Sequence, residues 1–356
     1  MGLPGLGGVL VELASGVDAL YLSGRAAVPD ALIERLESLR SEAVSAGRPV
    51  AVDLDGNEFM VAGHGFGKYR YCLRHPYGQV GVTASRSLPP IRVQPRSEFL
   101  HGVGPLPAVN WFEEALWSAA GPVLFTVSRM DLHSDWQGWS VDGDQRGRFV
   151  CRADRRDLHE ENERLTGFEF GRRSTGTVCA RIYDKSVEQE RKGTDFWLDV
   201  WGDRRDPTRP VLRVEFEFGR QALREYGLDR PAEAVEAAGA LWTSATEEWL
   251  TYRSPTADTT RSRWPVAPEW RDIQRASFAG GARGLTRMYD GRKAGSLRTL
   301  MPSLNGFVVK LAALTGADSI ENACSRLPGF LRDYELVSRQ SFASRVEARR
   351  GEMGVL

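Results

Sequence analysis

The chain has 356 residues, of which 42% are hydrophobic and 26% charged, an ordinary composition for a globular protein of about two domains. No apolar run reaches the ~18 residues of a membrane-spanning helix, and no signal peptide is apparent, so we expect a cytoplasmic protein with no membrane partner. The charges of the 47 basic and 47 acidic residues cancel. This excludes a strongly basic protein that binds nucleic acid through its overall charge, but not a local basic patch.

The spacing of cysteine and histidine argues against the common local metal motifs. The four cysteines form no C-x-x-C pair and are widely spaced, which disfavours a disulfide framework or a zinc finger and fits a reducing compartment. The five histidines occur neither as H-x-H nor as H-E-x-x-H.

Charge is segregated along the chain. Residues 1–60 hold four arginines and nine acids, whereas residues 251–350 hold 17 basic and nine acidic residues. The basic C-terminal third suits an anionic partner, although an ordinary basic domain would have the same composition. All but five of the basic residues are arginine, which favours bidentate phosphate binding but is equally the mark of a GC-rich genome.

The first predicted region, residues 1–107, combines one helix with several strands. The helix begins near Pro29, carries an apolar stripe, and ends at Gly47. Short alternating segments bounded by glycine predict antiparallel strands. These strands are Asp18–Leu22, Glu58–Val61, Tyr69–Leu73 and Gln79–Val82.

The second predicted region, residues 108–228, has similar elements. Asn110, with Glu113 three residues later, predicts a helix start, and Gly121 ends that helix. Four strands are predicted after it, at Val123–Val127, Gly167–Gly171, Val178–Tyr183 and Val211–Phe218. Two regions of such similar make-up suggest a duplicated α+β fold with two antiparallel sheet-and-helix units, although the halves share no visible identity.

The third predicted region, residues 229–356, loses strand character and predicts a helical, basic, DNA-binding domain. Helices are expected over Ala232–Leu250, from Pro302 to Gly316, and from Asp318 onward. A cluster of tryptophans in this region is typical of a helical core, but exposed tryptophans would also stack on bases. The cluster consists of Trp242, Trp249, Trp264 and Trp270.

Three predicted strands each carry reactive side chains on a single face, because residues two apart in a strand point the same way. The first face holds Arg129, Asp131, His133 and Asp135; the second holds Arg181, Tyr183 and Lys185; the third holds Arg213, Glu215 and Glu217. A sheet with one solvated face would alternate in the same way without any function. Acids and arginines are nevertheless unusual there, and neighbouring strands would bring the acids into an oxygen-rich site suited to Mg²⁺ or Mn²⁺.

Such a site has a natural chemistry for Tyr183. A phenol has a pKa of about 10 and is a poor nucleophile at neutral pH without help. Arg181, Lys185 and a metal ion would favour its phenolate, and the metal would also polarise a phosphoryl oxygen. Attack on a DNA phosphodiester would leave a phosphotyrosine link and a free 3′ hydroxyl.

Four ordered motifs resemble the replication initiation factor family, which comprises rolling-circle plasmid replication initiators and related relaxases of conjugative elements. Arg181–Glu188 (RIYDKSVE) is similar to the family's R-x-Y-[DE]-K-x-x-E motif, and Ser128–Asp135 (SRMDLHSD) to its R-[IL]-D-x-x-x-D strand. Gly171–Ser174 (GRRS) resembles its G-S-R-x-S turn. Arg213–Glu217 (RVEFE), followed by Gly219–Ala222, resembles its R-[FW]-E-h-[EQ]-x-[RK] strand and the helix after it. The match covers residues 120–225 well and residues 15–107 only loosely.

The resemblance implies two ferredoxin-like or rolling-circle-initiator-like units followed by a helical C-terminal domain, in a bacterial cytoplasmic protein. It implies Tyr183 as the nucleophile and Asp131 and Glu215 as metal ligands, with Glu217 and Asp135 as weaker candidates and His133 as a supporting residue. Glu169 departs from the family pattern and is either an extra ligand or exposed, the latter being favoured. Implied partners are origin DNA as duplex and single strand, a host helicase, and a second copy of the chain as a homodimer.

The basic residues near the tyrosine are candidates for DNA contact. Arg172 and Arg173 lie in a predicted turn beside the tyrosine strand, where arginine forks suit phosphate oxygens, although a solvated basic turn would look the same. Arg213 is a further candidate for DNA binding.

The sequence favours a metal-dependent site-specific nickase, or strand transferase, that acts at a replication or transfer origin. An alternative from another class is a non-catalytic DNA-binding regulator of a mobile element with the same fold, which would bind duplex in a salt-sensitive way without cutting it. A third possibility is a metal-dependent nuclease that uses water, in which Tyr183 is only structural.

Overall fold

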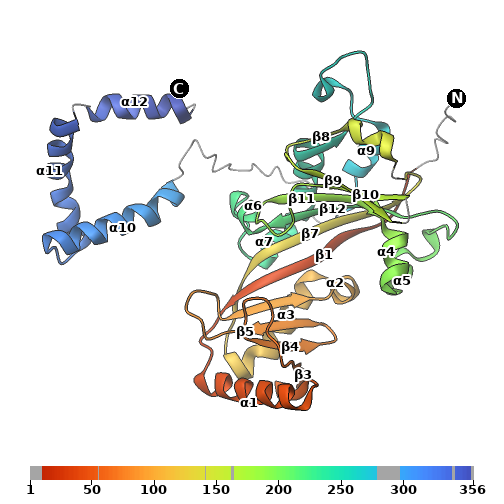
Figure 1. The fold of residues 1–356 in the computed structure, drawn as a ribbon, viewed down its shortest axis with the longest axis horizontal. Coiled ribbons are helices and arrows are strands. Elements are labelled where there is room, and N and C mark those ends of the chain that lie inside the picture. Colours follow the sequence, from red (N-terminus) through yellow and green to blue (C-terminus); the bar gives the residue numbers. More distant parts are fainter. Residues whose placement is uncertain are drawn as a thin grey trace. The chain divides into compact units, whose positions relative to one another are not determined.

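The computed structural model describes residues 10–278, apart from 55, 141 and 162–163, and residues 297–353, apart from 339–340. The chain divides into two compact units, residues 1–286 and 287–356, and the first contains an eleven-stranded antiparallel sheet (Figure 1). Its strands are β1 (Val11–Arg25), β2 (Val50–Leu54), β3 (Asn57–Val61), β4 (Tyr71–His75), β5 (Gly78–Val82), β6 (Ile91–Pro95), β7 (Leu124–Gln137), β9 (Arg156–Glu161), β10 (Arg164–Phe170), β11 (Val178–Asp184) and β12 (Leu212–Gly219).

The long strands β1 and β7 form the middle of this sheet and join its two halves. The spatial order is β2-β3-β4-β5-β6-β1-β7-β12-β11-β10-β9, so each long strand is flanked on its outer side by the other strands of its own half (Figure 1). The predicted boundary at residue 107 therefore does not divide the structure, because β1 pairs with β7 along nearly its whole length. A duplicated origin for the two halves stays a prediction.

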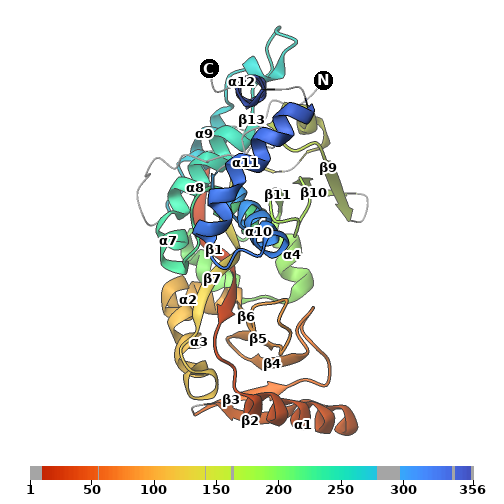
Figure 2. The ribbon, with the colours of Figure 1, turned by 90° about the vertical axis from the view of Figure 1, so that its left-hand side faces the viewer.

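Helices cover the sheet at several places (Figure 2). In the first unit they are α1 (Asp30–Ala46), α2 (Ser97–Val103), α3 (Pro105–Ala120), α4 (Lys185–Lys192), α5 (Phe196–Trp201), α6 (Arg220–Glu225), α7 (Pro231–Glu236), α8 (Ala238–Ser244) and α9 (Pro268–Gln274). A small second sheet pairs β8 (Phe149–Cys151) with β13 (Leu250–Tyr252). Helix α1 ends as predicted at Gly47, whose left-handed φ of 65° suits glycine.

One face of the β7–β12 region packs into the main hydrophobic core. Val214, Phe216 and Phe218 alternate with the polar residues of β12 and are fully buried. The ring of Phe216 meets the Trp242 ring edge-on, with centroids 5.3 Å apart, so α8 covers this face. Trp242, Trp249 and Trp270 are buried, which confirms the core interpretation for these three members of the tryptophan cluster.

The opposite face of the sheet carries the polar strand residues and is partly covered by α2, α4 and α5. Trp197 and Trp201 of α5 form a separate small core with Leu13 of β1 and Val211. This cover buries part of the polar face and leaves the part around β10 and β11 accessible.

Several predicted boundaries are wrong. Helix α3 begins at Pro105 rather than at Asn110, since proline suits the first turn of a helix. The predicted helix over residues 232–250 is interrupted at Ala237, passes into a π-helical turn, and ends before β13. Lys185 is not a strand residue, because the Asp184 side chain accepts hydrogen bonds from the backbone N–H groups of Ser186 and Val187 and so caps α4.

The second unit is helical where it is described, as predicted. Its helices are α10 (Leu297–Thr315), α11 (Ile320–Ser338) and α12 (Phe342–Met353). Helix α10 starts before Pro302 and ends, as expected, just before Gly316. Residues 229–278, predicted to belong to this domain, instead pack in the first unit. In the described parts of the chain, no helix has both the length and the apolar character needed to cross a bilayer.

Candidate active site

The three polar strand faces lie side by side, as predicted, because β7, β12 and β11 are consecutive in the sheet. Their register places the side chains in rows across the strands. The rows are Asp135–Arg213–Tyr183, His133–Glu215–Arg181 and Asp131–Glu217–Cys179. Residues of β7 and β12 that are 78 to 86 positions apart in sequence are thereby brought within contact distance.

Tyr183 lies at the accessible end of this arrangement and is half-buried. Its hydroxyl donates a hydrogen bond of 3.1 Å to Glu215 Oε2. The guanidinium of Arg181 pairs with the other oxygen of Glu215 and lies 5.1 Å from the centre of the Tyr183 ring. The ammonium of Lys185 lies 5.8 Å from the same ring centre.

A hollow of about 440 Å³ opens beside this tyrosine. Its walls include the cations Arg173, Arg181 and Arg191 as well as several acids. One of these acids is Glu169, whose carboxylate is 3.5 Å from His159 Nε2 and whose side chain is only 16% exposed. Glu169 is therefore a wall residue of the hollow, and the expectation that it is exposed is wrong.

The electrostatics hold the phenol in its neutral form. Burial and the neighbouring Glu215 carboxylate raise the pKa of Tyr183 well above its ordinary value, despite the opposing effect of Arg213 and Arg181. Burial alone would also raise the pKa of Glu215, but Arg181 and Arg213 outweigh it and lower that pKa. In this state the proton stays on the phenol, and the cations do not by themselves produce the phenolate.

Arg213 lies deeper, under the cover of α5. Its guanidinium donates to both oxygens of Asp135 at 2.6 and 2.7 Å, and to Asp18 Oδ1 at 3.1 Å. It also lies 3.9 Å from the centre of the Trp197 ring. Because its side chain is 0% exposed, Arg213 has no surface to offer DNA in this structure, and its predicted DNA contact stays a prediction. Arg213 neutralises buried carboxylates.

Lys185 is also largely covered. Its side chain is 6% exposed, pairs with Glu188, and lies 4.9 Å from the centre of the Trp197 ring. Burial and the nearby Arg213 lower the pKa of Lys185. A role for this lysine beside Tyr183 stays a prediction.

The carboxylates predicted to bind metal are each paired with arginine. Asp131 accepts hydrogen bonds from Arg129, which also lies 3.0 Å from Glu217. Glu217 is in addition 3.4 Å from Arg173, and Glu215 is held by Arg181. A metal ion at Asp131, Glu215 and Glu217 stays a prediction, and it would have to displace these arginines. Burial and the carboxylates of Glu215 and Glu217 raise the pKa of Asp131 to about 7.

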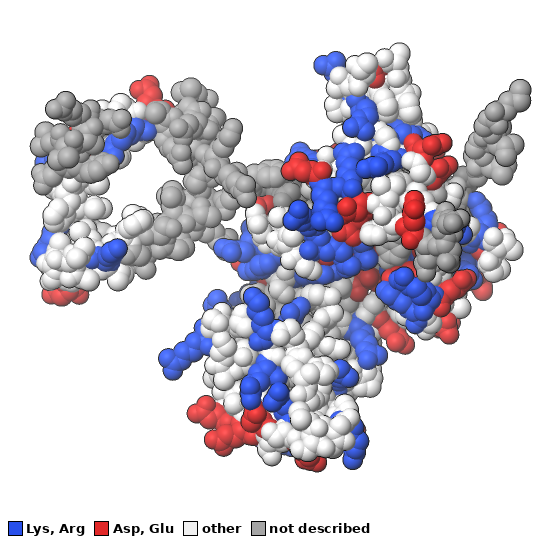
Figure 3. All heavy atoms as spheres, viewed as in Figure 1, with Lys and Arg blue, Asp and Glu red and all other residues white. Residues whose placement is uncertain are grey.

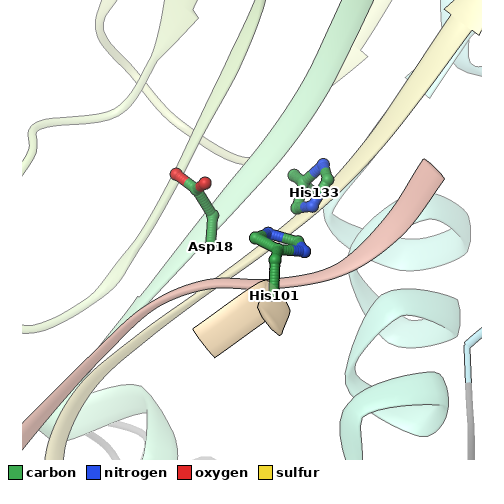
Figure 4. A group of neighbouring side chains, drawn as sticks. All are labelled: Asp18, His101 and His133. Atoms are coloured by element: carbon green, nitrogen blue, oxygen red, sulfur yellow. The ribbon is translucent and has the colours of Figure 1, made fainter. Parts of the chain in front are cut away.

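A different group of ligating side chains comes together on the same face. Asp18, His101 and His133 each place one ligand atom within 4.8 Å of the others (Figure 4). They come from β1, α2 and β7, so no local motif in the sequence signals them. The one available signal in the sequence is His133 on the polar face of the β7 segment, which is predicted to be a supporting residue.

Basic residues surround the accessible part of the polar face. The turn that carries Arg172 and Arg173 is exposed and lies beside the Tyr183 hollow. A second hollow of about 510 Å³ begins on the other side of this turn, with Lys68, Arg92 and Arg129 in its walls. Figure 3 shows basic side chains gathered over the strands β9 to β12, with acidic side chains among them.

Known proteins resemble this chain in structure rather than in sequence. No family model matches the chain, and no curated protein matches it. The solved structure of a rolling circle replication initiator protein from Geobacillus stearothermophilus is similar with a TM-score of 0.44 and 16% sequence identity, over 76% of this chain and 98% of that chain.

Proposed function

We propose that the chain is a DNA strand transferase that nicks one strand at a specific site, with Tyr183 as the nucleophile. The observation that carries the proposal concerns Tyr183, which lines a hollow with arginines in its walls and whose hydroxyl donates a hydrogen bond to Glu215. The ordered motifs of the sequence support the same assignment. A tyrosine beside a carboxylate and an arginine has the three groups that phosphoryl transfer requires: nucleophile, base and charge stabiliser.

Glu215 is the base in this proposal. The phenol proton passes to Glu215 Oε2 as the phenol oxygen bonds to phosphorus, and the bond from phosphorus to the 3′ oxygen breaks. The departing oxygen takes up a proton, so the net reaction moves one proton from tyrosine to the new 3′ hydroxyl. The products are a 5′-phosphotyrosine link and a free 3′ end.

Arg181 has two tasks in this proposal. At rest it neutralises Glu215 and keeps the pKa of that carboxylate low, which makes Glu215 a weak base. A DNA phosphate in the hollow competes for the same guanidinium, since arginine forks match phosphate oxygens. When Arg181 turns toward the phosphate, Glu215 loses its counter-charge and becomes a stronger base, so substrate binding itself activates the nucleophile.

Arg172 and Arg173 extend the cationic surface from the hollow. They are exposed on a turn between the Tyr183 hollow and the second basic hollow, a suitable path for the backbone of a single strand. A divalent ion, Mg²⁺ or Mn²⁺, would polarise a phosphoryl oxygen when bound. A host helicase and a homodimer stay predictions.

The test uses a pool of random-sequence single-stranded DNA, incubated with the full chain and Mn²⁺ and separated under denaturing conditions. The wild type is expected to form a covalent protein–DNA adduct, which peptide mass spectrometry locates on Tyr183. Tyr183→Phe should form none. Glu215→Gln should form it roughly 10²–10⁴-fold more slowly, because it lacks the base.

Tyr77→Phe is the matched control, because this tyrosine is 40% exposed and lies in the turn between β4 and β5, in the other half of the first unit. It should form the adduct at the wild-type rate. An adduct that persists in Tyr183→Phe refutes the mechanism. Salt-sensitive binding without any adduct favours the non-catalytic regulator, and cleavage that leaves a free 5′ phosphate favours the water-using nuclease.

A further inference from the structure

The imidazoles of His133, which is buried, and His101, which is partly buried, converge with the carboxylate of Asp18 on the polar face. His133 projects from β7 and its side chain is 0% exposed. His101 projects from α2, and its ring centroid lies 5.0 Å from that of His133. Asp18 reaches the same place because β1 has an irregular register between Val17 and Ala19, which inserts it opposite β7 as an extra residue.

The hydrogen bonds of this cluster leave ligand atoms available. The Nε2 atoms of both His101 and His133 are buried and have no hydrogen-bond partner among the described residues. Both hydrogen bonds described for Asp18 are accepted by Oδ1, from Ser97 and Arg213, and neither involves Oδ2. A buried imidazole nitrogen without a partner is costly unless something binds it.

The residues that contact His133 are arranged as they usually are around a metal-binding histidine. Nδ1 of His133 lies 3.4 Å from Asp135 Oδ1, which leaves Nε2 as the atom free to bind. Asp135 is fixed in turn by Arg213 and by the indole N–H of Trp201 at 2.8 Å.

We propose that Asp18, His101 and His133 form a binding site for a divalent transition-metal ion. Ligand atoms around one ion at about 2.0–2.2 Å lie roughly 3–4 Å apart, so atoms already within 4.8 Å need only small side-chain movements. Two nitrogens and one oxygen select Mn²⁺, Co²⁺ or Zn²⁺ over Mg²⁺, which prefers oxygen ligands. Three protein ligands leave further coordination positions open.

The inference does not depend on the proposed nicking function, because it concerns metal binding in the absence of DNA. The two sites are nevertheless neighbours. Glu215 is paired with His133 in the strand register and accepts the hydrogen bond of Tyr183. A metal ion at the cluster would therefore lie next to the carboxylate that contacts the nucleophile.

The experiment titrates Co²⁺ into the chelator-treated full chain and records visible d–d absorption. One Co²⁺ per chain is expected to bind, with bands that Zn²⁺ abolishes and excess Mg²⁺ does not. His101→Ala should remove the bands. Asp18→Asn, which keeps the size of the side chain, should weaken the affinity by roughly 10–100-fold. His64→Ala is the matched control: it also removes one imidazole, but an exposed one outside the cluster, and should bind like the wild type.

Folding of each variant is checked by circular dichroism in the absence of metal. If the histidine variant does not fold, the proton NMR spectrum of the wild type with Co²⁺ decides, since two coordinated imidazoles give two sets of strongly shifted signals. The proposal is overturned if the wild type binds no Co²⁺, if the shifted signals do not come from two imidazoles, or if folded His101→Ala binds as tightly as His64→Ala.

Discussion

Replacing Arg213 tests whether this residue is a structural counter-charge or a DNA contact. Arg213→Met keeps the apolar stem beside Trp197 but removes the guanidinium that neutralises Asp135. Both partners are 0% exposed, so the variant leaves a buried carboxylate without its cation. Removing one partner of a buried ion pair costs about 3–5 kcal/mol, and the lost contact with the Trp197 ring adds about 1 kcal/mol. The indole N–H of Trp201 still donates a hydrogen bond of 2.8 Å to Asp135 and offsets part of the loss. We therefore expect the free energy of unfolding to fall by about 3–4 kcal/mol.

Urea unfolding followed by tryptophan fluorescence measures this cost in the first unit alone, because all ten tryptophans lie between residues 111 and 270. Adding Asp135→Asn should restore roughly half of the loss, since the amide oxygen still accepts from Trp201 and carries no charge. A cost below about 1 kcal/mol, or a double variant no more stable than the single one, would refute the reasoning. Unchanged stability with weakened DNA binding would support the DNA-contact role.

Two further predictions concern stability away from the chemistry. In Gly219→Ala, the new Cβ would lie 2.5 Å from the Cα of Gly176 and would force two backbone segments apart. We expect urea unfolding to show a free energy of unfolding lower by about 1–3 kcal/mol. Gly143→Ala is the control: its new Cβ would have no atom within 4 Å, so it should cost far less. The hydrogen bonds from Arg70 lower the pKa of Glu37 from 4.5 to about 2, so this group stabilises the fold above pH 4.5 and loses that effect as the pH falls toward 2. Melting temperatures across this range should fall less steeply for Glu37→Gln than for wild type; equal slopes would contradict the assignment.

Much of the fold follows from local pattern. The alternation of Arg213, Glu215 and Glu217 with Val214 and Phe216 predicts a strand with one polar face, and the structure has it there. Glycine and proline mark the ends of α1 and α3 for the same local reason. The start of α3 and the strand-to-helix change at Lys185 were missed, because competing capping groups lie within a few residues of each other.

The sequence by itself determined which residues point to the polar face of each strand, since the period of a strand is fixed by its backbone. The strand order also agrees with the expectation that the strands carrying Tyr183 and Glu215 are neighbours. The sequence pattern of a strand does not show which helices cover the sheet. Helix α5 places Trp197 over Arg213, and this cover buries a residue that the sequence predicts to contact DNA.

Only the tertiary structure shows that Asp18, His101 and His133 form a cluster. Its members come from a bulged strand, a short helix and a central strand that lie far apart in sequence, so no spacing rule could link them. The physical reason is general: local backbone geometry sets the direction of a side chain, whereas its partners depend on long-range pairing of β1 with β7 and on the packing of α2 against β1.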